Sequence, residues 1–114
     1  MADACKKIIM TDKPEPYKCI PLQEAQELLN NPETVIIDIR DKVSYQAGNI
    51  PNSINLSEKN IVDFLDSTDR EVPLLVYCYH GINSKEAAEY FVSNGFQTVF
   101  SLDGGFSEFS QQNL

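Results

Sequence analysis

The segment Cys78–Ser84 combines a cysteine, a histidine and a glycine within a few residues. It follows an apolar run at residues 73–77 and precedes a helical pattern that begins at Lys85. This order predicts a strand that delivers Cys78 into a tight loop, which a helix closes. Such loops direct backbone N–H groups and the positive end of a helix dipole toward their centre. The sulfur of Cys78 is the expected occupant.

Backbone donors around a sulfur favour the thiolate over the neutral thiol. We therefore expect a lowered pKa for Cys78 and a nucleophilic sulfur. Gly81 supplies the backbone freedom that a tight ring needs. Asn83, with Glu86 three residues later, predicts a capping box at the start of the helix. The alternative for Cys78 is a structural thiol buried at the end of a core strand, which is common for free cysteine.

His80 is the only histidine of the sequence and lies two residues after Cys78. In a ring whose N–H groups point inward, side chains should point outward, so we do not expect His80 to be the base for Cys78. Tyr79, His80 and Ile82 are instead expected to form the rim through which reactants enter. A solvated rim without a specific role is the alternative.

Short apolar segments alternate with helical patterns along the chain. We expect strands at residues 17–20, 34–37, 53–56, 73–78 and 98–100, and helices that start at Pro21, at Val43, at Ser57 as the N-cap, and after the Cys78 loop. This alternation predicts an α/β domain with a mainly parallel central sheet and helices on both faces. Because ligands bind at the carboxyl ends of such strands, Asp38 should lie at the same edge as Cys78. We interpret Asp38 and Arg40 as a structural ion pair at that edge.

The composition indicates one domain. With 114 residues and 42% apolar content, the chain can bury one core. Residues 1–16 contain two prolines near their end and little periodicity, so we expect a tail or a loosely docked arm there and a domain over residues 17–114.

Charge and cysteine usage restrict the function. A formal net charge of −8 argues against nucleic acid and against an anionic membrane surface as partners. Cys5, Cys19 and Cys78 are too few and too irregularly spaced for a disulfide framework or a metal site, so we expect no metal and a reducing, cytoplasmic environment. Cys5 is expected to have no specialised role, with a resolving thiol as the alternative.

Several motifs occur in an order that resembles the rhodanese-type sulfurtransferases, most closely their short single-domain bacterial members of the glycerol-operon type. These motifs are residues 35–41 (VIIDIRD), 48–56 (GNIPNSINL), 78–88 (CYHGINSKEAA) and 102–109 (LDGGFSEF). Asn49, Asn52 and Phe109 depart from the His, Gly and Trp that are frequent in the family at these positions. Residues 79–84 also lack the arginine that many members carry, so Lys85 is the nearest candidate to assist anion binding.

The resemblance implies a rhodanese-like fold and an enzyme that needs no cofactor. Cys78 would take a sulfane sulfur from a small anionic donor such as thiosulfate and pass it, as a persulfide, to cyanide or a cellular thiol, with a thioredoxin-like protein as one candidate acceptor. The loop residues Tyr79, His80, Gly81, Ile82, Asn83 and Ser84 would bind the substrate, with their backbone N–H groups stabilising charge on the sulfur.

Two other functions are considered. A cysteine-based phosphatase or arsenate reductase uses a similar loop, but that loop is one residue longer or ends in an arginine that clamps the oxyanion. Ser84 occupies the final loop position here, and Tyr77 replaces the usual preceding His, which disfavours phosphoryl transfer. A rhodanese module that carries sulfur or binds a partner without turnover is the second alternative.

Overall fold

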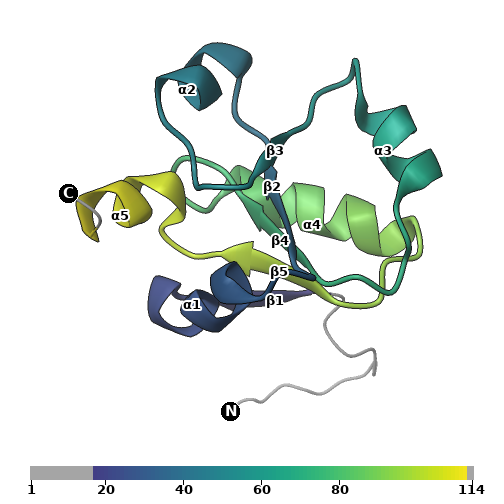
Figure 1. The fold of residues 1–114 in the computed structure, drawn as a ribbon, viewed down its shortest axis with the longest axis horizontal. Helices are drawn as coiled ribbons and strands as arrows, with labels where there is room; N and C mark the ends of the chain where they lie inside the picture. Colours follow the sequence, from purple (N-terminus) through teal and green to yellow (C-terminus); the bar gives the residue numbers. More distant parts are fainter. Residues whose placement is uncertain (1–16, 113–114) are drawn as a thin grey trace.

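Five strands and five helices alternate along the part of the chain that the structure, a computed structural model, describes, residues 17–112 (Figure 1). The strands are β1 (Lys18–Ile20), β2 (Val35–Asp38), β3 (Ile54–Asn55), β4 (Leu74–Tyr77) and β5 (Val99–Leu102). The helices are α1 (Leu22–Asn30), α2 (Lys42–Ala47), α3 (Ile61–Ser67), α4 (Asn83–Ser93) and α5 (Gly105–Gln112).

The strands form one parallel sheet in the order β1-β5-β4-β2-β3. Strand β4 is central, because it pairs with β2 on one side and with β5 on the other. Its four residues are all buried, as expected for a strand that is covered on both faces. All carboxyl ends therefore meet at one edge, where Asp38 pairs in register with Tyr77, the residue before Cys78. The predicted α/β fold and the shared edge are confirmed.

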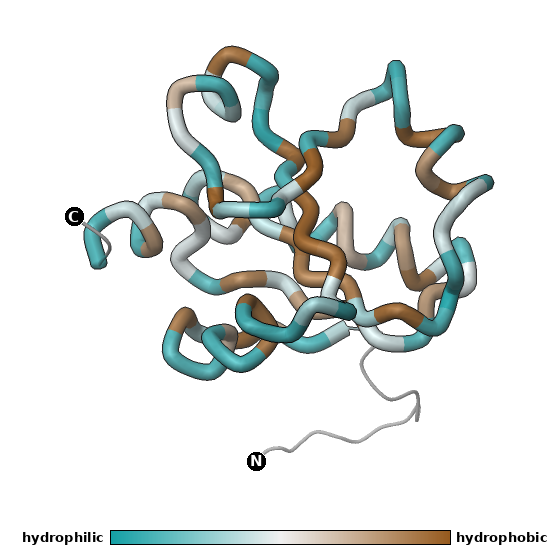
Figure 2. Tube along the Cα trace, in the orientation of Figure 1, coloured by the Kyte–Doolittle hydropathy of each residue, from teal (hydrophilic) through white to brown (hydrophobic). Residues whose placement is uncertain are grey.

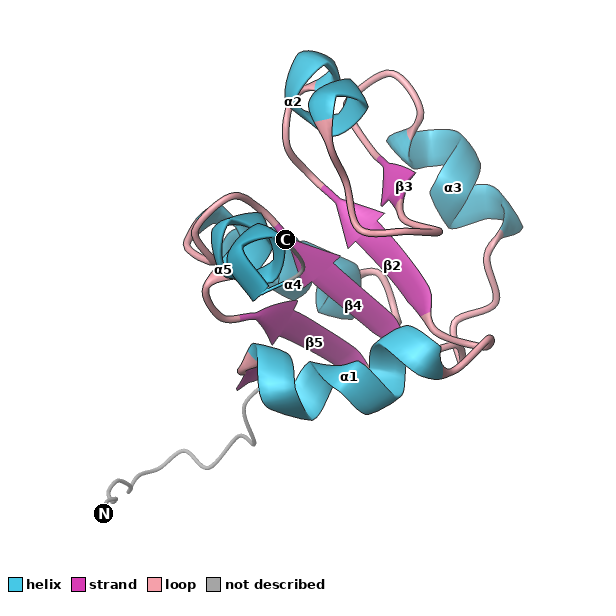
Figure 3. Cartoon of the chain, turned by 60° about the vertical axis from the view of Figure 1, so that its left-hand side comes forward, coloured by secondary structure: helices cyan, strands magenta, loops and turns pink. Residues whose placement is uncertain are grey.

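Alternation along β4 divides the core between the two faces of the sheet. Leu74 and Val76 belong to one cluster, with residues of α3 and α4, whereas Leu75 and Tyr77 belong to the other, with residues of α1 and α5. Figure 3 shows α1 in front of the sheet and α4 behind it. Because side chains alternate between faces, the next residue, Cys78, falls on the α4 side.

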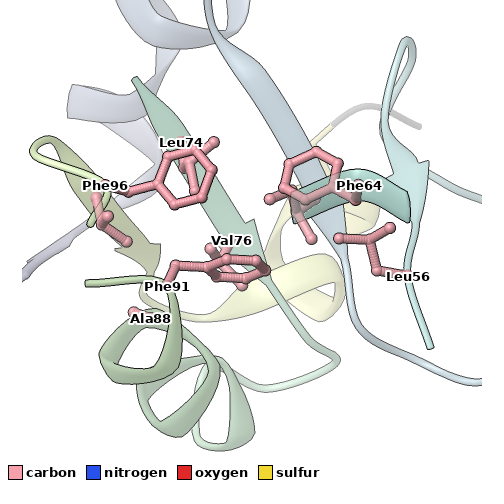
Figure 4. Close-up of a cluster of buried hydrophobic side chains, with 9 residues drawn as sticks. Leu56, Phe64, Leu74, Val76, Ala88, Phe91 and Phe96 are labelled. Atoms are coloured by element: carbon pink, nitrogen blue, oxygen red, sulfur yellow. The ribbon is translucent and has the colours of Figure 1, made fainter. Parts of the chain in front are cut away.

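Aromatic side chains fill the core on the α4 side. The ring centroid of Phe91 lies 5.9 Å from that of Phe64 and 5.9 Å from that of Phe96, both in edge-to-face geometry (Figure 4). Figure 2 shows that the hydrophobic residues concentrate along the central strands. These contacts hold α4, and with it the loop that precedes α4, firmly against the sheet.

The predicted helix start at Ser57 is wrong. Helix α3 begins at Ile61, four residues after the expected N-cap Ser57. Asn60 Oδ1 accepts the Ser57 N–H at 2.8 Å, and the Ser57 carbonyl accepts the N–H groups of Asn60 and Ile61, so residues 57–60 form a turn that precedes the helix. Ser57 and Asn60 therefore close a turn before the helix, and Ser57 is not the N-cap that the sequence pattern indicated.

Two expectations concern residues that the structure does not describe. The predicted tail or arm, residues 1–16, and Cys5 within it lie outside the described residues.

Among the helices that are described, none has the length and apolar character needed to span a membrane.

Asn52 occupies a backbone conformation that glycine adopts most readily. Its φ of +69° lies in the left-handed region, and it is the one non-glycine residue with positive φ among the described residues. Asparagine tolerates this conformation better than most residues. Asn49 donates its side-chain amide to the Tyr45 carbonyl at 2.9 Å, which fixes the end of α2.

Candidate active site

Cys78 directly follows β4 and lies at the centre of the loop that leads into α4. Its sulfur accepts the Gly81 N–H at 3.1 Å and the Ser84 N–H at 3.3 Å. The residue is 5% exposed, so only a small reactant or a projecting group can reach the sulfur. The predicted cradle of backbone donors around the sulfur is confirmed.

The pKa of the Cys78 thiol reflects two opposing effects. Burial acts to raise the pKa, because it disfavours the charged thiolate. Hydrogen bonds from the Ser84 hydroxyl, from the Ser84 N–H, and from the N–H groups of Gly81 and Asn83 act in the other direction. The hydrogen bonds prevail, so the pKa of Cys78 lies below its ordinary value, as the sequence predicts.

The predicted capping box at the start of α4 is wrong. Helix α4 begins at Asn83 itself, Ile82 occupies the N-cap position, and no side chain caps the helix. The Ser84 N–H, which is an unsatisfied donor of the first turn, is bound by the Cys78 sulfur. The sulfur thus takes the role of the capping acceptor, so a capping side chain is not needed at Asn83.

Helix α5 holds the loop from its other side. The Phe106 N–H donates to the Cys78 carbonyl at 2.8 Å, and the Ser107 N–H donates to the Tyr79 carbonyl at 2.9 Å. The C=O and N–H of a trans peptide lie in one plane and point in opposite directions, so carbonyls that are held toward α5 turn the N–H groups of the following residues away from it. No helix is predicted after the last expected strand, at residues 98–100, so sequence reasoning missed α5.

Glycines let the two backbones approach one another. A Cβ atom on Gly81 would lie 2.9 Å from the Gly104 nitrogen, and one on Gly105 would contact the carbonyl oxygens of Cys78 and Tyr79. Both glycines also have positive φ, +90° for Gly81 and +55° for Gly105. The requirement for glycine at these positions therefore arises from the close contact between the loop and the start of α5.

Exposed side chains surround the buried sulfur. Tyr79 is 51% exposed and Ile82 is 70% exposed. His80 is also exposed and packs edge-on against the Tyr79 ring, with the ring centroids 4.5 Å apart. Lys85 is exposed in the first turn of α4. This exposure fits the rim expected of Tyr79, His80 and Ile82, whose part in substrate binding remains a prediction.

Asp38 and Arg40 form the structural ion pair that the sequence predicts. An Arg40 terminal nitrogen lies 2.7 Å from Asp38 Oδ2, and both side chains are almost fully buried. Arg40 also donates to the Gly48 carbonyl at 2.6 Å and places its guanidinium 4.2 Å from the centre of the Phe106 ring. The pair thereby connects the end of β2 to the residue that follows α2 and to α5, beside the loop.

Ser101 is a buried polar residue that sequence reasoning missed. Its hydroxyl oxygen lies 2.7 Å from that of Ser84, and both residues are fully buried. The available signal was a serine within the otherwise apolar strand at residues 99–102. Buried hydroxyls of this kind require partners, so such a serine indicates a specific contact.

A buried cysteine held by loop N–H groups, at the end of a central parallel strand, defines a class of cysteine-dependent α/β domains. Within this class the chain belongs to the rhodanese-like domain family, whose model matches residues 21–112. The structural comparison agrees: a rhodanese-like domain protein from Staphylococcus aureus superimposes with a TM-score of 0.68 at 27% identity, covering 79% of this chain and 88% of that chain.

Curated relatives carry a specific name. A thiosulfate sulfurtransferase GlpE from Pseudoalteromonas translucida (strain TAC 125) is 46% identical over 91 residues, which cover 80% of this chain and 87% of the relative. The protein of the same name from Pseudomonas fluorescens (strain SBW25) is 46% identical over 90 residues, which cover 79% of this chain and 82% of that protein. The resemblance found in the motifs is therefore confirmed at the level of the family.

Proposed function

We propose that this chain is a thiosulfate sulfurtransferase that carries sulfane sulfur as a persulfide on Cys78. The observation that supports this most directly is the buried sulfur with its two backbone donors at 3.1 and 3.3 Å. Donors in this position favour the thiolate before the reaction, and they suit a negatively charged persulfide after it. The names of the relatives supply the donor, thiosulfate.

The reaction proceeds in two displacements. The Cys78 thiolate attacks the outer sulfur of thiosulfate, the S–S bond of thiosulfate breaks, and sulfite leaves with the bonding electron pair. Cyanide or a thiolate then attacks the terminal sulfur of the persulfide, and the S–S bond breaks with its electrons returning to Cys78. Neither step requires a change in the total oxidation state of the reactants. Ping-pong kinetics follow from this sequence, and intersecting double-reciprocal lines would contradict it.

The chain's own residues support each step. Gly81 and Ser84 hold the sulfur through their N–H groups, and α5 keeps the loop carbonyls on the opposite side. The loop residues 79–84 contain no lysine or arginine, so we propose that the anionic sulfur donor is bound by backbone N–H groups, with Lys85 as the next positive charge along the sequence. We assign the physiological acceptor to the thiols, a thioredoxin-like protein among them, and the reaction to the reducing cytoplasm that the cysteine usage suggests.

The test is the intact mass of the reduced protein after brief exposure to thiosulfate and then to cyanide. We expect the protein to gain the mass of one sulfur atom and to lose it to cyanide. The Cys78→Ser variant should gain nothing, whereas the matched Cys19→Ser variant, altered at an exposed cysteine, should behave as the parent. A folded, reduced protein that never gains mass would refute thiosulfate as the donor.

A further inference from the structure

An apolar groove lies beside the Cys78 loop, on the side of the sheet that α4 covers. Its volume is about 330 Å³, and six apolar or aromatic side chains line it: Ile39, Leu56, Ile61, Ala87, Tyr90 and Phe91. Leu56 and Phe91 are drawn in Figure 4. Tyr90 is 45% exposed, so the groove is open to solvent. We call this space the Ile39 groove.

Strand pairing places the Ile39 groove next to the sulfur. Ile39 follows β2, and its N–H donates to the Tyr77 carbonyl at 3.1 Å. Since Asp38 is in register with Tyr77, Ile39 lies opposite Cys78. Leu56 follows β3 and lies opposite Ile39 in the same way, with its N–H donating to the Asp38 carbonyl at 3.0 Å. Because neighbouring strands are about 4.8 Å apart, the row from Cys78 across Ile39 to Leu56 spans about 10 Å.

The side chains of this row share one face of the sheet. Leu56 belongs to the core cluster on the α4 side and Ile39 packs against that cluster, which is also the side on which Cys78 falls. Ala87 lies three residues after Ser84, whose N–H binds the sulfur, so these two residues are neighbours on one face of α4. The short side chain of Ala87 leaves space that a longer one would fill. The groove therefore leads outward from the site between the sheet edge and α4.

The lining of the groove indicates what it binds. An open apolar groove of this volume suits an aliphatic chain, which leaves water when it binds there. Among the described residues that line the groove, Glu58 is the one that carries a charge, and it is exposed two residues beyond Leu56, at the end away from Cys78. A carboxylate there attracts a cation and repels an anion. The complementary occupant is an aliphatic chain with an amino group at its far end.

We propose that the Ile39 groove binds the aliphatic arm of a small aminothiol that accepts sulfur from Cys78, with the amino group facing Glu58. The proposal deepens the proposed function by naming the acceptor class, and it rests on that function for the reaction. The acceptor thiolate forms a bond to the terminal sulfur of the persulfide, the S–S bond to Cys78 breaks, and its electron pair returns to the Cys78 sulfur. Because this sulfur belongs to a residue that is 5% exposed, an arm held in the groove directs the thiol toward it.

The test is the rate of sulfur transfer from loaded Cys78 to straight-chain thiols of increasing length that end in an amino or a hydroxyl group. The full chain is loaded with thiosulfate and freed of the excess, and loss of the persulfide to each thiol is followed by intact mass. At pH 7 we expect the rate constant to rise about twofold per methylene up to a chain of about five carbons. Thiols that end in an amino group should react about threefold faster than the hydroxyl-ended thiols of the same length.

Matched variants locate the effect in the groove. Ala87→Leu fills part of the groove and should abolish the rise with chain length, whereas Ala47→Leu, the same change at an exposed position of α2 outside the groove, should keep it. Glu58→Gln should remove the advantage of the amino group, whereas Glu89→Gln, at an exposed position of α4 outside the groove, should retain it. The intrinsic reactivity of each thiol cancels, because every protein meets the same thiols. Alkylation of Cys78 by iodoacetamide, which has no long arm, should proceed at the parent rate in all four variants.

A parent rate that does not depend on chain length would overturn the proposal, and it is the result expected if residues 1–16 or a second copy of this chain cover the groove. A rise that Ala87→Leu retains, or an amino-group advantage that Glu58→Gln retains, would also overturn it. If Ala87→Leu does not fold, Tyr90→Ala provides the test. This change removes a half-exposed wall of the groove and should reduce the rise to about 1.3-fold per methylene.

A second reagent separates this proposal from the proposed function. Alkyl methanethiosulfonates transfer an alkylthio group to the Cys78 thiolate: a new S–S bond forms to Cys78, the S–S bond of the reagent breaks, and methanesulfinate leaves with the electron pair. This reaction needs no sulfur loading, and its rate should show the same dependence on chain length and the same response to Ala87→Leu. A protein that rejects thiosulfate but shows this dependence would therefore refute only the proposed function.

Discussion

Tyr77 shows how one buried side chain supports the edge of the sheet where the site lies. Its hydroxyl oxygen accepts the Ile50 N–H at 3.1 Å and lies 3.1 Å from the Ser53 hydroxyl. Burial, together with the neighbouring Asp38 carboxylate, raises the pKa of Tyr77 to about 12. The tyrosine is thus held in its neutral form, beside the residue whose anionic form the loop favours.

The raised pKa of Tyr77 predicts a loss of stability at high pH. Above the ordinary pKa near 10, unfolded tyrosine releases a proton that the folded protein retains, so rising pH favours unfolding. The stabilisation of the folded protein by the neutral Tyr77 side chain is fully present below pH 10 and is lost as the pH approaches 12. Measured by denaturant unfolding, the unfolding free energy should fall by about 2 kcal/mol between pH 9 and pH 11.5 because of this residue. The Tyr77→Phe variant should lack that part of the slope, and equal slopes would contradict the prediction.

The sequence pointed to the proposed nucleophile, Cys78, more readily than to the residues that hold it in place. Cys78 could be predicted because a cysteine after an apolar run and before a helix has a distinctive pattern. The buried contact of Ser101 could not be predicted, since its partner, Ser84, lies 17 residues earlier in the chain. The capping box failed for a related reason: the acceptor that replaces the cap is a sulfur brought in by the loop.

At the scale of elements, the start of α5 holds the Cys78 loop in place through hydrogen bonds. Its first N–H groups bind the carbonyls of Cys78 and Tyr79, so one helix start orients the loop while another, that of α4, lies against the sulfur. Strands and most helices were predictable from their alternation. Helix α5 was not, because its glycine, two serines and two phenylalanines, preceded by a second glycine, give the first part of the helix little intrinsic helix preference.

Substituting Gly105 by alanine should disrupt both stability and the site. The new Cβ would collide with the backbone carbonyls of Cys78 and Tyr79 and would strain a residue with φ of +55°. We expect a loss of roughly 2–4 kcal/mol in unfolding free energy and a several-fold slower alkylation of Cys78 at pH 7.

Gly95→Ala is the matched control for this substitution. Gly95 also has positive φ, +99°, but a Cβ atom added there would have as its nearest neighbour an Arg70 side-chain atom 3.7 Å away. This variant should lose about 1 kcal/mol and keep its alkylation rate. If both variants lose the same free energy and react alike, the contact between α5 and the loop is not what requires Gly105.

At the scale of the whole molecule, charge opposes the approach of an anionic donor. The chain has a formal net charge of −8, and thiosulfate is a dianion. Repulsion between them acts over distances that salt shortens, from roughly 20 Å at low ionic strength to a few ångströms. Local donors in the loop must therefore bind the anion against the field of the rest of the protein.

Salt should consequently accelerate sulfur loading. We expect the rate constant for loading Cys78 from thiosulfate to rise about two- to threefold when the ionic strength increases from about 0.02 to 0.3 M. Alkylation by neutral iodoacetamide, measured in parallel, corrects for any change in the thiolate fraction. A rate that falls with salt would instead show that a nearby cation attracts the donor, and Lys85→Gln should then abolish the dependence.

The direct contact to the sulfur from Gly81 comes from the main chain, whereas Tyr79, His80 and Ile82 expose their side chains to solvent. Substitutions at these three exposed positions can alter which acceptors fit without removing the donors that the reaction uses. Recognition and chemistry are in this way free to evolve separately. New partner specificities can arise on the same scaffold by changing the outward-facing residues alone, and a library randomised at these positions should retain sulfur loading in most members.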